Sequence, residues 1–303
     1  MLRRLSLLLE SIRFAHSVFA LPFALVAMVV AADGGGLAWR TVGLIVLCMV
    51  SARSAAMAFN RWADRDSDAA NPRTQARPTV TGAVSPRFLL VFTMSCAAVF
   101  WGAAWLLNPV CFACAPAVLA LLLGYSLSKR FTSLCHFWLG LALGLAPVGA
   151  HLAVRGDFAP LQGLGQRWGL PVELFPLLLG LVVLLWTAGF DLIYACQDYA
   201  VDMADPRAHS LPKTLGIRNA LVLSAALHLV SAALLVVVGL YAGLGVWYYL
   251  AVAAVSALLV YEHWIVRPGD LSRVNVAFFT VNGVVSVLLF VAVFVERVVL
   301  RGY

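Results

Sequence analysis

The chain has 303 residues, of which 63% are hydrophobic and 12% charged, and its formal net charge is +7 at pH 7. This composition excludes an intrinsically disordered chain and an ordinary water-soluble domain. The positive charge does not indicate nucleic-acid binding, because no soluble segment interleaves basic and aromatic residues. We therefore expect an integral membrane protein that lies in the lipid bilayer.

Nine apolar segments are long enough to cross a bilayer as helices, which requires about 20 residues each. They cover residues 14–32, 41–59, 87–107, 109–128, 134–154, 171–194, 219–242, 245–265 and 274–297. The fold is therefore predicted to be all-α, a multi-pass membrane protein with about nine transmembrane helices. No boundary typical of soluble domains is visible, so residues 1–303 are expected to form one domain with halves of roughly 1–133 and 134–303.

The distribution of Lys and Arg predicts the orientation of the chain, since cytoplasmic loops carry an excess of these residues. If the N-terminus is cytoplasmic, 15 of the 21 basic residues lie on the cytoplasmic side and five on the other. The basic N-terminus reads as a positive flank rather than as part of a signal peptide. We expect an inner-membrane protein of bacteria, with its polar loops in the cytoplasm.

Acidic residues are concentrated in two stretches, each of which follows an apolar segment. Residues 60–68 and 191–205 contain seven of the fourteen Asp and Glu residues. Residues four positions apart on a helix lie on one face. The residues that share a face in this way are Asn60, Asp64 and Asp68 in the first stretch, and Asp191, Asp198 and Asp202 in the second.

A purely structural explanation is that helix ends become polar where they leave the bilayer. That explains one aspartate, but not two spaced sets or an Asp191 that still lies within an apolar segment, where ionisable groups usually mark function. Oxygen ligands favour Mg²⁺, which proteins hold with a few carboxylates and substrate phosphates. The pattern predicts a Mg²⁺–diphosphate site at the cytoplasmic surface.

Basic residues on the same side are candidate ligands of the diphosphate. Arg suits bidentate contact with phosphate, and Lys provides a point charge. The candidates are Arg73, Arg77, Lys129, Arg130 and Lys213. Each has a plain alternative role as a positive flank of a membrane helix. Lys129 and Arg130 are favoured, because they end an apolar segment that could reach the same cavity.

Arg53 lies within the second apolar segment, seven residues before Asn60 and on the same helical face. A guanidinium at that depth is expected to face a polar cavity and bind an anion. It could pair with Asp191, but a substrate carboxylate is the favoured partner, with Arg13 as a second candidate. Tyr125 and Tyr194, near the polar loops, could face a developing carbocation.

These residues together resemble the paired aspartate motifs of the UbiA superfamily of intramembrane prenyltransferases. Further matches are Arg53 before the first motif, Arg73 and Arg77 after it, and the run from Tyr125 through Lys129 and Arg130. Within the superfamily the chain is most similar to the 4-hydroxybenzoate polyprenyltransferases and their relatives in futalosine-route menaquinone synthesis. Arg61 departs from many of the hydroxybenzoate enzymes, which have Asp at this position, so the ring of the acceptor stays open.

The resemblance implies nine transmembrane helices around a central cavity and Mg²⁺-dependent transfer of a polyprenyl group from its diphosphate to an aromatic acid, in ubiquinone or menaquinone biosynthesis. It implies that Asn60, Asp64, Asp68, Asp198 and Asp202 hold the metal. Arg53 would bind the ring carboxylate, and Asp191 would orient the phenol or assist its deprotonation. No obligate protein partner is implied.

Two alternatives remain open at this point. A UbiA-type enzyme could act on another acceptor, such as haem or chlorophyllide. A secondary transporter would also contain repeats and buried charge, although its site is expected near the bilayer midplane.

Overall fold

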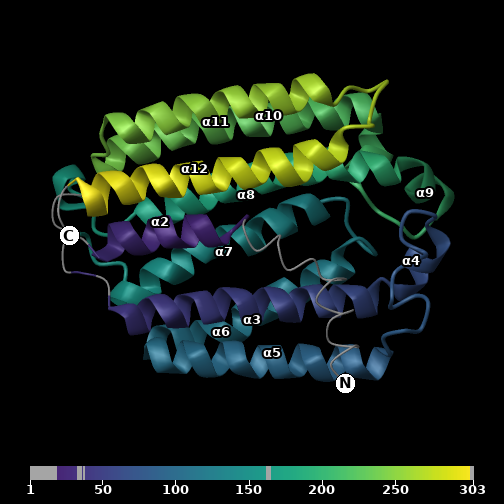
Figure 1. Ribbon diagram of the computed structural model, residues 1–303, viewed down its shortest axis with the longest axis horizontal. Helices are drawn as coiled ribbons and strands as arrows, with labels where there is room; N and C mark the ends of the chain where they lie inside the picture. Colours follow the sequence, from purple (N-terminus) through teal and green to yellow (C-terminus); the bar gives the residue numbers. More distant parts are fainter. Residues whose placement is uncertain (1–18, 33–35, 37, 162–164, 301–303) are drawn as a thin grey trace.

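The computed structural model describes residues 19–32, 36, 38–161 and 165–300 (Figure 1). Eight of its helices are long and apolar enough to cross a membrane, and a ninth apolar helix is shorter. The described residues form no β-strand, only an isolated bridge between Arg267 and Asp270. The prediction of an all-α membrane protein with about nine transmembrane helices is therefore confirmed.

The helices lie side by side along the longest axis of the molecule (Figure 1). In chain order the membrane helices are α2 (Leu21–Ala32), α3 (Trp39–Ala63), α5 (Pro86–Leu107), α6 (Pro109–Ser128), α7 (Cys135–Arg155), α8 (Phe175–Ala195), α10 (Leu211–Ala242), α11 (Val246–Ile265) and α12 (Asn282–Phe294). The π-helical segments Val276–Val281 and Val295–Val299 extend α12 at both ends. Residues 14–18 of the first predicted segment lie outside the described residues.

Helix α10 begins eight residues before the apolar segment predicted at 219–242. The Ser210 hydroxyl accepts a hydrogen bond from the amide of Lys213 at 3.3 Å, and Pro212 stands in the first turn, where its missing N–H costs nothing. Gly216 breaks the helix with φ 78° and ψ 159°, a conformation that side chains disfavour. Hydropathy could not place this start, because Lys213, Thr214 and Arg218 interrupt the apolar residues before 219.

Helices α7 and α8 pack closely because glycines face each other where they cross. A Cβ atom on Gly144 would lie 2.6 Å from the carbonyl oxygen of Gly180, and one on Gly180 would lie 2.7 Å from that of Gly144. Small residues let membrane helices approach in this way, where van der Waals packing drives association. The contact fixes the position of the first turn of α7 relative to the last turns of α8.

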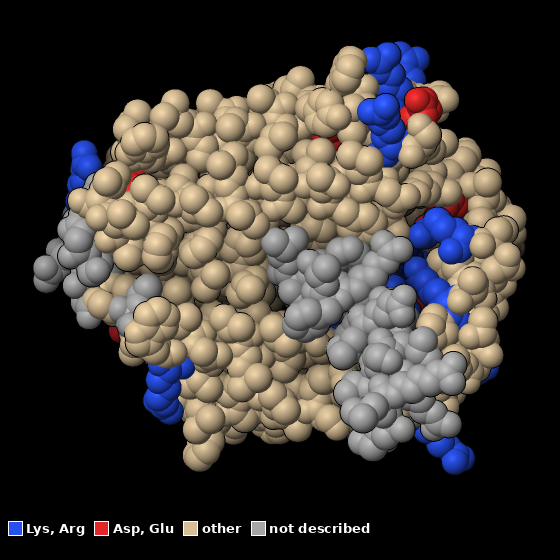
Figure 2. All heavy atoms as spheres, in the orientation of Figure 1, with Lys and Arg blue, Asp and Glu red and all other residues tan. Residues whose placement is uncertain are grey.

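Each acidic stretch forms a short helix after a long one. Helix α4 (Arg65–Ala70) follows α3, and α9 (Tyr199–Ala204) follows α8 through the 3-10 turn Cys196–Asp198. The two short helices lie at the same end of the molecule (Figure 1). On the face in Figure 2, Lys and Arg gather toward the ends, whereas the described surface between them is mostly uncharged, as contact with lipid requires.

Candidate active site

The first acidic stretch lies where α3 ends. Asn60 stands in the last turn of α3 and donates from Nδ2 to Oδ2 of Asp64 at 2.8 Å, so these two residues share a face as predicted. Helix α3 ends at Ala63, and Asp64 caps it with φ −89° and ψ 6°. This break turns α4 away from the axis of α3, and Asp68 therefore does not continue the same contact. Burial raises the pKa of the Asp64 carboxyl group.

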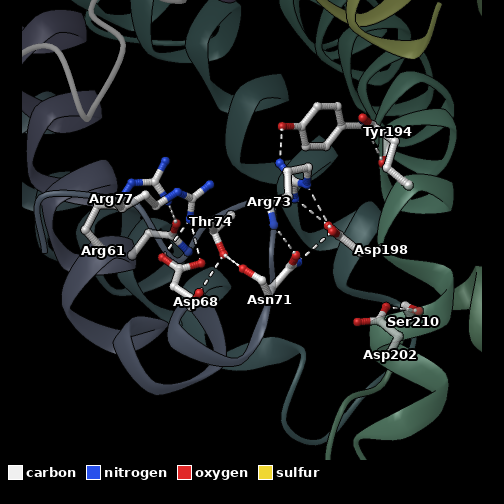
Figure 3. Close-up of polar contacts among 12 residues, drawn as sticks. Arg61, Asp68, Asn71, Arg73, Thr74, Arg77, Tyr194, Asp198, Asp202 and Ser210 are labelled. Atoms are coloured by element: carbon white, nitrogen blue, oxygen red, sulfur yellow. Dashed lines mark hydrogen bonds and ion pairs between the residues drawn. The ribbon is translucent and has the colours of Figure 1, made fainter. Parts of the chain in front are cut away.

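Asp68 is buried and binds an arginine of the loop that follows. Arg77 Nη1 lies 2.6 Å from both carboxylate oxygens of Asp68. Thr74 donates from Oγ1 to the Asp68 backbone carbonyl at 2.9 Å and so fixes the loop on α4. Arg61 is buried beside this pair and donates to Asn60 Oδ1 at 3.3 Å, while its Nε has no partner among the described residues (Figure 3).

Asp198 of the second stretch binds the same loop of the first. Arg73 donates to it from Nε at 3.1 Å and from Nη2 at 2.6 Å, and Asn71 donates from Nδ2 at 2.9 Å (Figure 3). Arg73 Nη1 also donates to the Tyr194 hydroxyl at 2.9 Å, and its guanidinium lies 5.2 Å from the centre of that ring. These contacts join the two predicted motifs into one site.

The outer edge of the site is held by the residues that lead into α10. Asp202 accepts a hydrogen bond from the Ser210 hydroxyl at 2.7 Å. Lys213 donates from Nζ to the backbone carbonyls of Asp205 at 2.7 Å and Ala208 at 2.8 Å. In this structure Lys213 therefore stabilises its own loop, and its contact with a diphosphate stays a prediction.

Two further predicted cations lie where α6 ends. Arg130 donates to the Ala63 carbonyl at 2.6 Å and so binds the end of α3. Lys129 forms no hydrogen bond or ion pair with another side chain in the described ranges, and it lies between the two acidic stretches. Burial lowers the Lys129 pKa, but the surrounding groups, which include Asp191 and Asp64, outweigh burial and raise it.

A cavity of about 230 Å³ opens beside these residues, between α3, α5, α6 and α7. Arg53, Asn60 and Tyr125 form its polar end, and Cys111 and Leu152 line it near the opposite ends of their helices. The remaining lining is almost entirely apolar. The Arg53 side chain forms no hydrogen bond or ion pair with any residue that the structure describes. Arg13, the second candidate for binding the substrate carboxylate, lies outside the described residues.

The structure adds a partner that the sequence analysis missed. His136, in the first turn of α7, donates from Nδ1 to Oδ2 of Asp191 at 2.6 Å. Arg53 is therefore not the partner of Asp191. The only sign of this contact in the sequence was that His136 is a polar residue at the start of an apolar segment. The contacts of Asn71 and Ser210 were also missed, because residue spacing alone assigns no role to an isolated polar side chain.

The ligand atoms of this site fit magnesium in kind, because they are carboxylate and amide oxygens. Their placement differs from that of a closed metal cage. Within residues 19–32, 36, 38–161 and 165–300, no three His, Cys, Asp or Glu side chains come together to hold a metal ion. Asp68 and Asp198 instead bind Arg77 and Arg73.

Comparison with known proteins agrees with this architecture. A sequence model described as the UbiA prenyltransferase family matches residues 20–284. A 4-hydroxybenzoate octaprenyltransferase of Alkalilimnicola ehrlichii is 32% identical over 236 residues, which cover 75% of this chain and 72% of that protein.

Solved structures extend the similarity to three dimensions. The apo structure of a UbiA homologue from Aeropyrum pernix K1 has a TM-score of 0.81 and 32% identity, covering 93% of this chain and 98% of that one. A UbiA homologue from Archaeoglobus fulgidus, bound to DMAPP and Mg²⁺, has a TM-score of 0.70 and 20% identity, covering 97% and 99%. At that identity the second likeness concerns the fold alone. With its membrane helices and two joined acidic motifs, this chain belongs to the UbiA prenyltransferase family.

Proposed function

We propose that this prenyltransferase moves a polyprenyl group from polyprenyl diphosphate to an aromatic acid, either 4-hydroxybenzoate or a dihydroxynaphthoate, with Mg²⁺ as its cofactor. The observation that carries the proposal is Arg53, a cation without a described partner at the polar end of an apolar cavity. Such a group calls for an anionic ligand whose remainder is apolar. An aromatic acid has this character.

The donor fits the other parts of the same site. An apolar cavity about 230 Å³ in size suits a prenyl chain, and the acidic stretches beside it suit a diphosphate with its metal. Asn60, Asp64, Asp68, Asp198 and Asp202 would hold Mg²⁺. A bound Mg²⁺ supplies Lewis-acid stabilisation of the charge on the departing diphosphate.

The chain's own cations would stabilise the same charge. Arg73 and Arg77 lie at the acidic residues that would bind the metal. The Lys129 ammonium lies near Asp64 and Asp191 and forms no ion pair with any described residue. Electrostatic stabilisation by such fixed groups is strong where water is excluded. Arg130 and Lys213 are bound to backbone carbonyls, so we assign them a smaller part.

The acceptor would enter at the polar end of the cavity. The Arg53 guanidinium would bind the ring carboxylate, since its planar donors match a carboxylate in geometry. Asp191 would orient the phenol. Tyr125 lines the same end and would face the allylic carbon, where ring faces stabilise positive charge, whereas Tyr194 supports Arg73.

The names of relatives support this assignment without extending it. The Alkalilimnicola ehrlichii relative is called a 4-hydroxybenzoate octaprenyltransferase, and the Archaeoglobus fulgidus homologue is bound to DMAPP and Mg²⁺. The proposal includes one catalytic domain over residues 1–303, a place in the bacterial inner membrane, and a cytoplasmic active site. It includes no nucleic acid and no obligate protein partner.

The experiment is a competition between the two acceptors. Membranes that contain the protein would receive octaprenyl diphosphate, Mg²⁺, and equal amounts of 4-hydroxybenzoate and 1,4-dihydroxy-6-naphthoate, and the products would be separated by mass. We expect one prenylated acid to dominate, which names the acceptor. Prenylation of neither acid, by membranes in which the protein is folded, would overturn the proposed acceptor class.

A further inference from the structure

His136 and Asp191 form a buried pair near Tyr125, which lines the cavity and lies close enough for the Asp191 charge to act on it. The exposed fraction of His136 is 0% and that of the Asp191 side chain is 11%, so the contact at 2.6 Å is shielded from solvent. An ionised carboxylate only accepts hydrogen bonds, so Nδ1 of His136 carries the hydrogen. The other ring nitrogen, Nε2, is buried and has no partner in the described part of the chain.

The bond leaves one oxygen of Asp191 available. His136 occupies Oδ2, and Oδ1 takes no hydrogen bond from any described residue. Oδ1 is not among the fully buried atoms that lack a partner, and the Asp191 side chain as a whole keeps 11% exposure. Asp191 is also one of the groups whose charge acts on Lys129, so the two side chains lie near each other.

The orientation of Asp191 depends on two helices rather than one. Asp191 comes from α8 and His136 from α7, and the Gly144–Gly180 crossing holds these helices at close range. Without the imidazole, the carboxylate could rotate about two side-chain bonds. With the imidazole in place, Oδ2 is held against α7, and Oδ1 therefore points in a fixed direction.

We propose that His136 is a positioning residue for the acceptor: it holds Oδ2 of Asp191 so that Oδ1 accepts the hydrogen bond of the acceptor's phenolic hydroxyl. This inference rests on the proposed function. It assigns the recognition of the acceptor's two ends to separate groups, Arg53 for the carboxylate and the His136–Asp191 pair for the hydroxyl. A hydroxyl bound to a carboxylate is more electron-donating, which favours attack by the ring carbon next to it.

The plain alternative is that the pair only joins α7 to α8. A structural bond of that kind would affect folding and every kinetic constant alike. A positioning residue affects the acceptor more than the donor, because a misplaced group raises the barrier only where it contacts the substrate. The two roles therefore differ in the pattern of KM values.

Three variants separate these roles. His136→Leu removes the donor, whereas His136→Asn returns an N–H group near the position of Nδ1. His151→Leu is the matched control, because His151 is a second histidine of α7 with 0% exposure and neither of its ring nitrogens has a hydrogen-bond partner among the residues that the structure describes. Steady-state KM and kcat would be measured for the acid and for the polyprenyl diphosphate separately, with thermal unfolding of each variant in detergent.

We expect His136→Leu to lower kcat/KM for the acid by about a hundredfold, the effect of a displacement near 1 Å at a reacting group. The donor KM stays unchanged, His136→Asn recovers much of the loss, and His151→Leu behaves as the wild type. The double variant with Asp191→Asn is no worse than Asp191→Asn alone, because both changes remove one unit.

Two results would overturn the inference. One is acceptor kinetics in His136→Leu equal to those of the wild type. The other is an equal loss for donor and acid that His136→Asn does not recover, together with a lower unfolding temperature. A wild-type enzyme that prenylates neither acid would instead contradict the proposed function, and the inference with it.

Discussion

Arg73 binds Asp198 through two hydrogen bonds, from Nε to Oδ1 at 3.1 Å and from Nη2 to Oδ2 at 2.6 Å. The two residues are 125 positions apart in the chain: Asp198 belongs to the second acidic stretch, and Arg73 to the loop that follows the first. The pair therefore brings the loop after α4 onto the end of α8. Because Arg is a bidentate donor for both carboxylate and phosphate, the same side chain could bind the diphosphate.

We predict that Arg73→Ala lowers kcat/KM for the polyprenyl diphosphate by about tenfold to a hundredfold, since hydrogen bonds to charged groups contribute about 1.5–3 kcal/mol. Arg73→Lys recovers little, because an ammonium cannot replace two parallel donors. Steady-state kinetics with varied donor check this. The control is Arg87→Ala, an exposed arginine at the start of α5. Equal activity of Arg73→Ala and Arg87→Ala would contradict the assignment.

Arg53→Ala is predicted to weaken the acid specifically. Loss of a charged hydrogen bond to the carboxylate lowers kcat/KM for 4-hydroxybenzoate by about tenfold to a hundredfold. Methyl 4-hydroxybenzoate carries no negative charge at this position, so the wild type and the variant use it equally. Measuring kcat/KM for both substrates with both proteins isolates the interaction between Arg53 and the carboxylate charge. If the variant loses as much with the ester as with the acid, Arg53 has another role.

Cys111→Phe is predicted to shorten the cavity at the end opposite Arg53. A larger side chain there excludes the distal part of a long prenyl chain but leaves a short one room. We expect kcat/KM for octaprenyl diphosphate to fall about tenfold or more, the usual effect of a small misfit in an apolar pocket. Geranyl diphosphate is affected much less.

The control for this prediction is Cys96→Phe, a half-buried cysteine of α5 that does not line the cavity. A parallel loss with both donors, or the same result in Cys96→Phe, would mean that the prenyl chain follows another path.

Gly144→Ala is predicted to destabilise the protein, because its Cβ would lie 2.6 Å from the Gly180 carbonyl oxygen. Forced separation of packed elements typically costs about 1–3 kcal/mol. Thermal unfolding in detergent would show a lower midpoint. Gly149→Ala on the same helix meets nothing within 4 Å, so its midpoint stays equal or rises slightly, as alanine favours helix. Identical midpoints for the two variants would show that α7 and α8 can separate freely.

The sequence was sufficient to predict the membrane helices. Membrane helices satisfy their own backbone, so hydropathy identified them within a few residues. The two acidic stretches that the sequence singled out lie at one end of the molecule (Figure 1), and their role in binding a substrate stays a prediction. The start of α10 was missed, since Lys213, Thr214 and Arg218 interrupt the apolar residues that follow the Ser210 cap.

Pairings between distant segments could not be predicted in the same way. Several arginines on one side were equivalent in sequence, and only the fold assigns Arg77 to Asp68 and Arg73 to Asp198. His136 contacts Asp191 because of the point along their lengths at which α7 and α8 cross. Neither the spacing of residues nor the composition predicts that point. Such contacts decide which groups are left free for a substrate.

Metal-dependent prenyl transfer by the purified protein is the decisive measurement of the proposed reaction. The protein in liposomes would receive octaprenyl diphosphate and radiolabelled acid, with Mg²⁺ or with EDTA, beside Asp64→Asn. We predict prenylated acid only with Mg²⁺, recovery when Mg²⁺ is restored, and a loss of about a hundredfold or more in Asp64→Asn, since a bound metal supplies several kcal/mol. Product that forms equally in EDTA and in Asp64→Asn, or no product from either acid, would contradict the account.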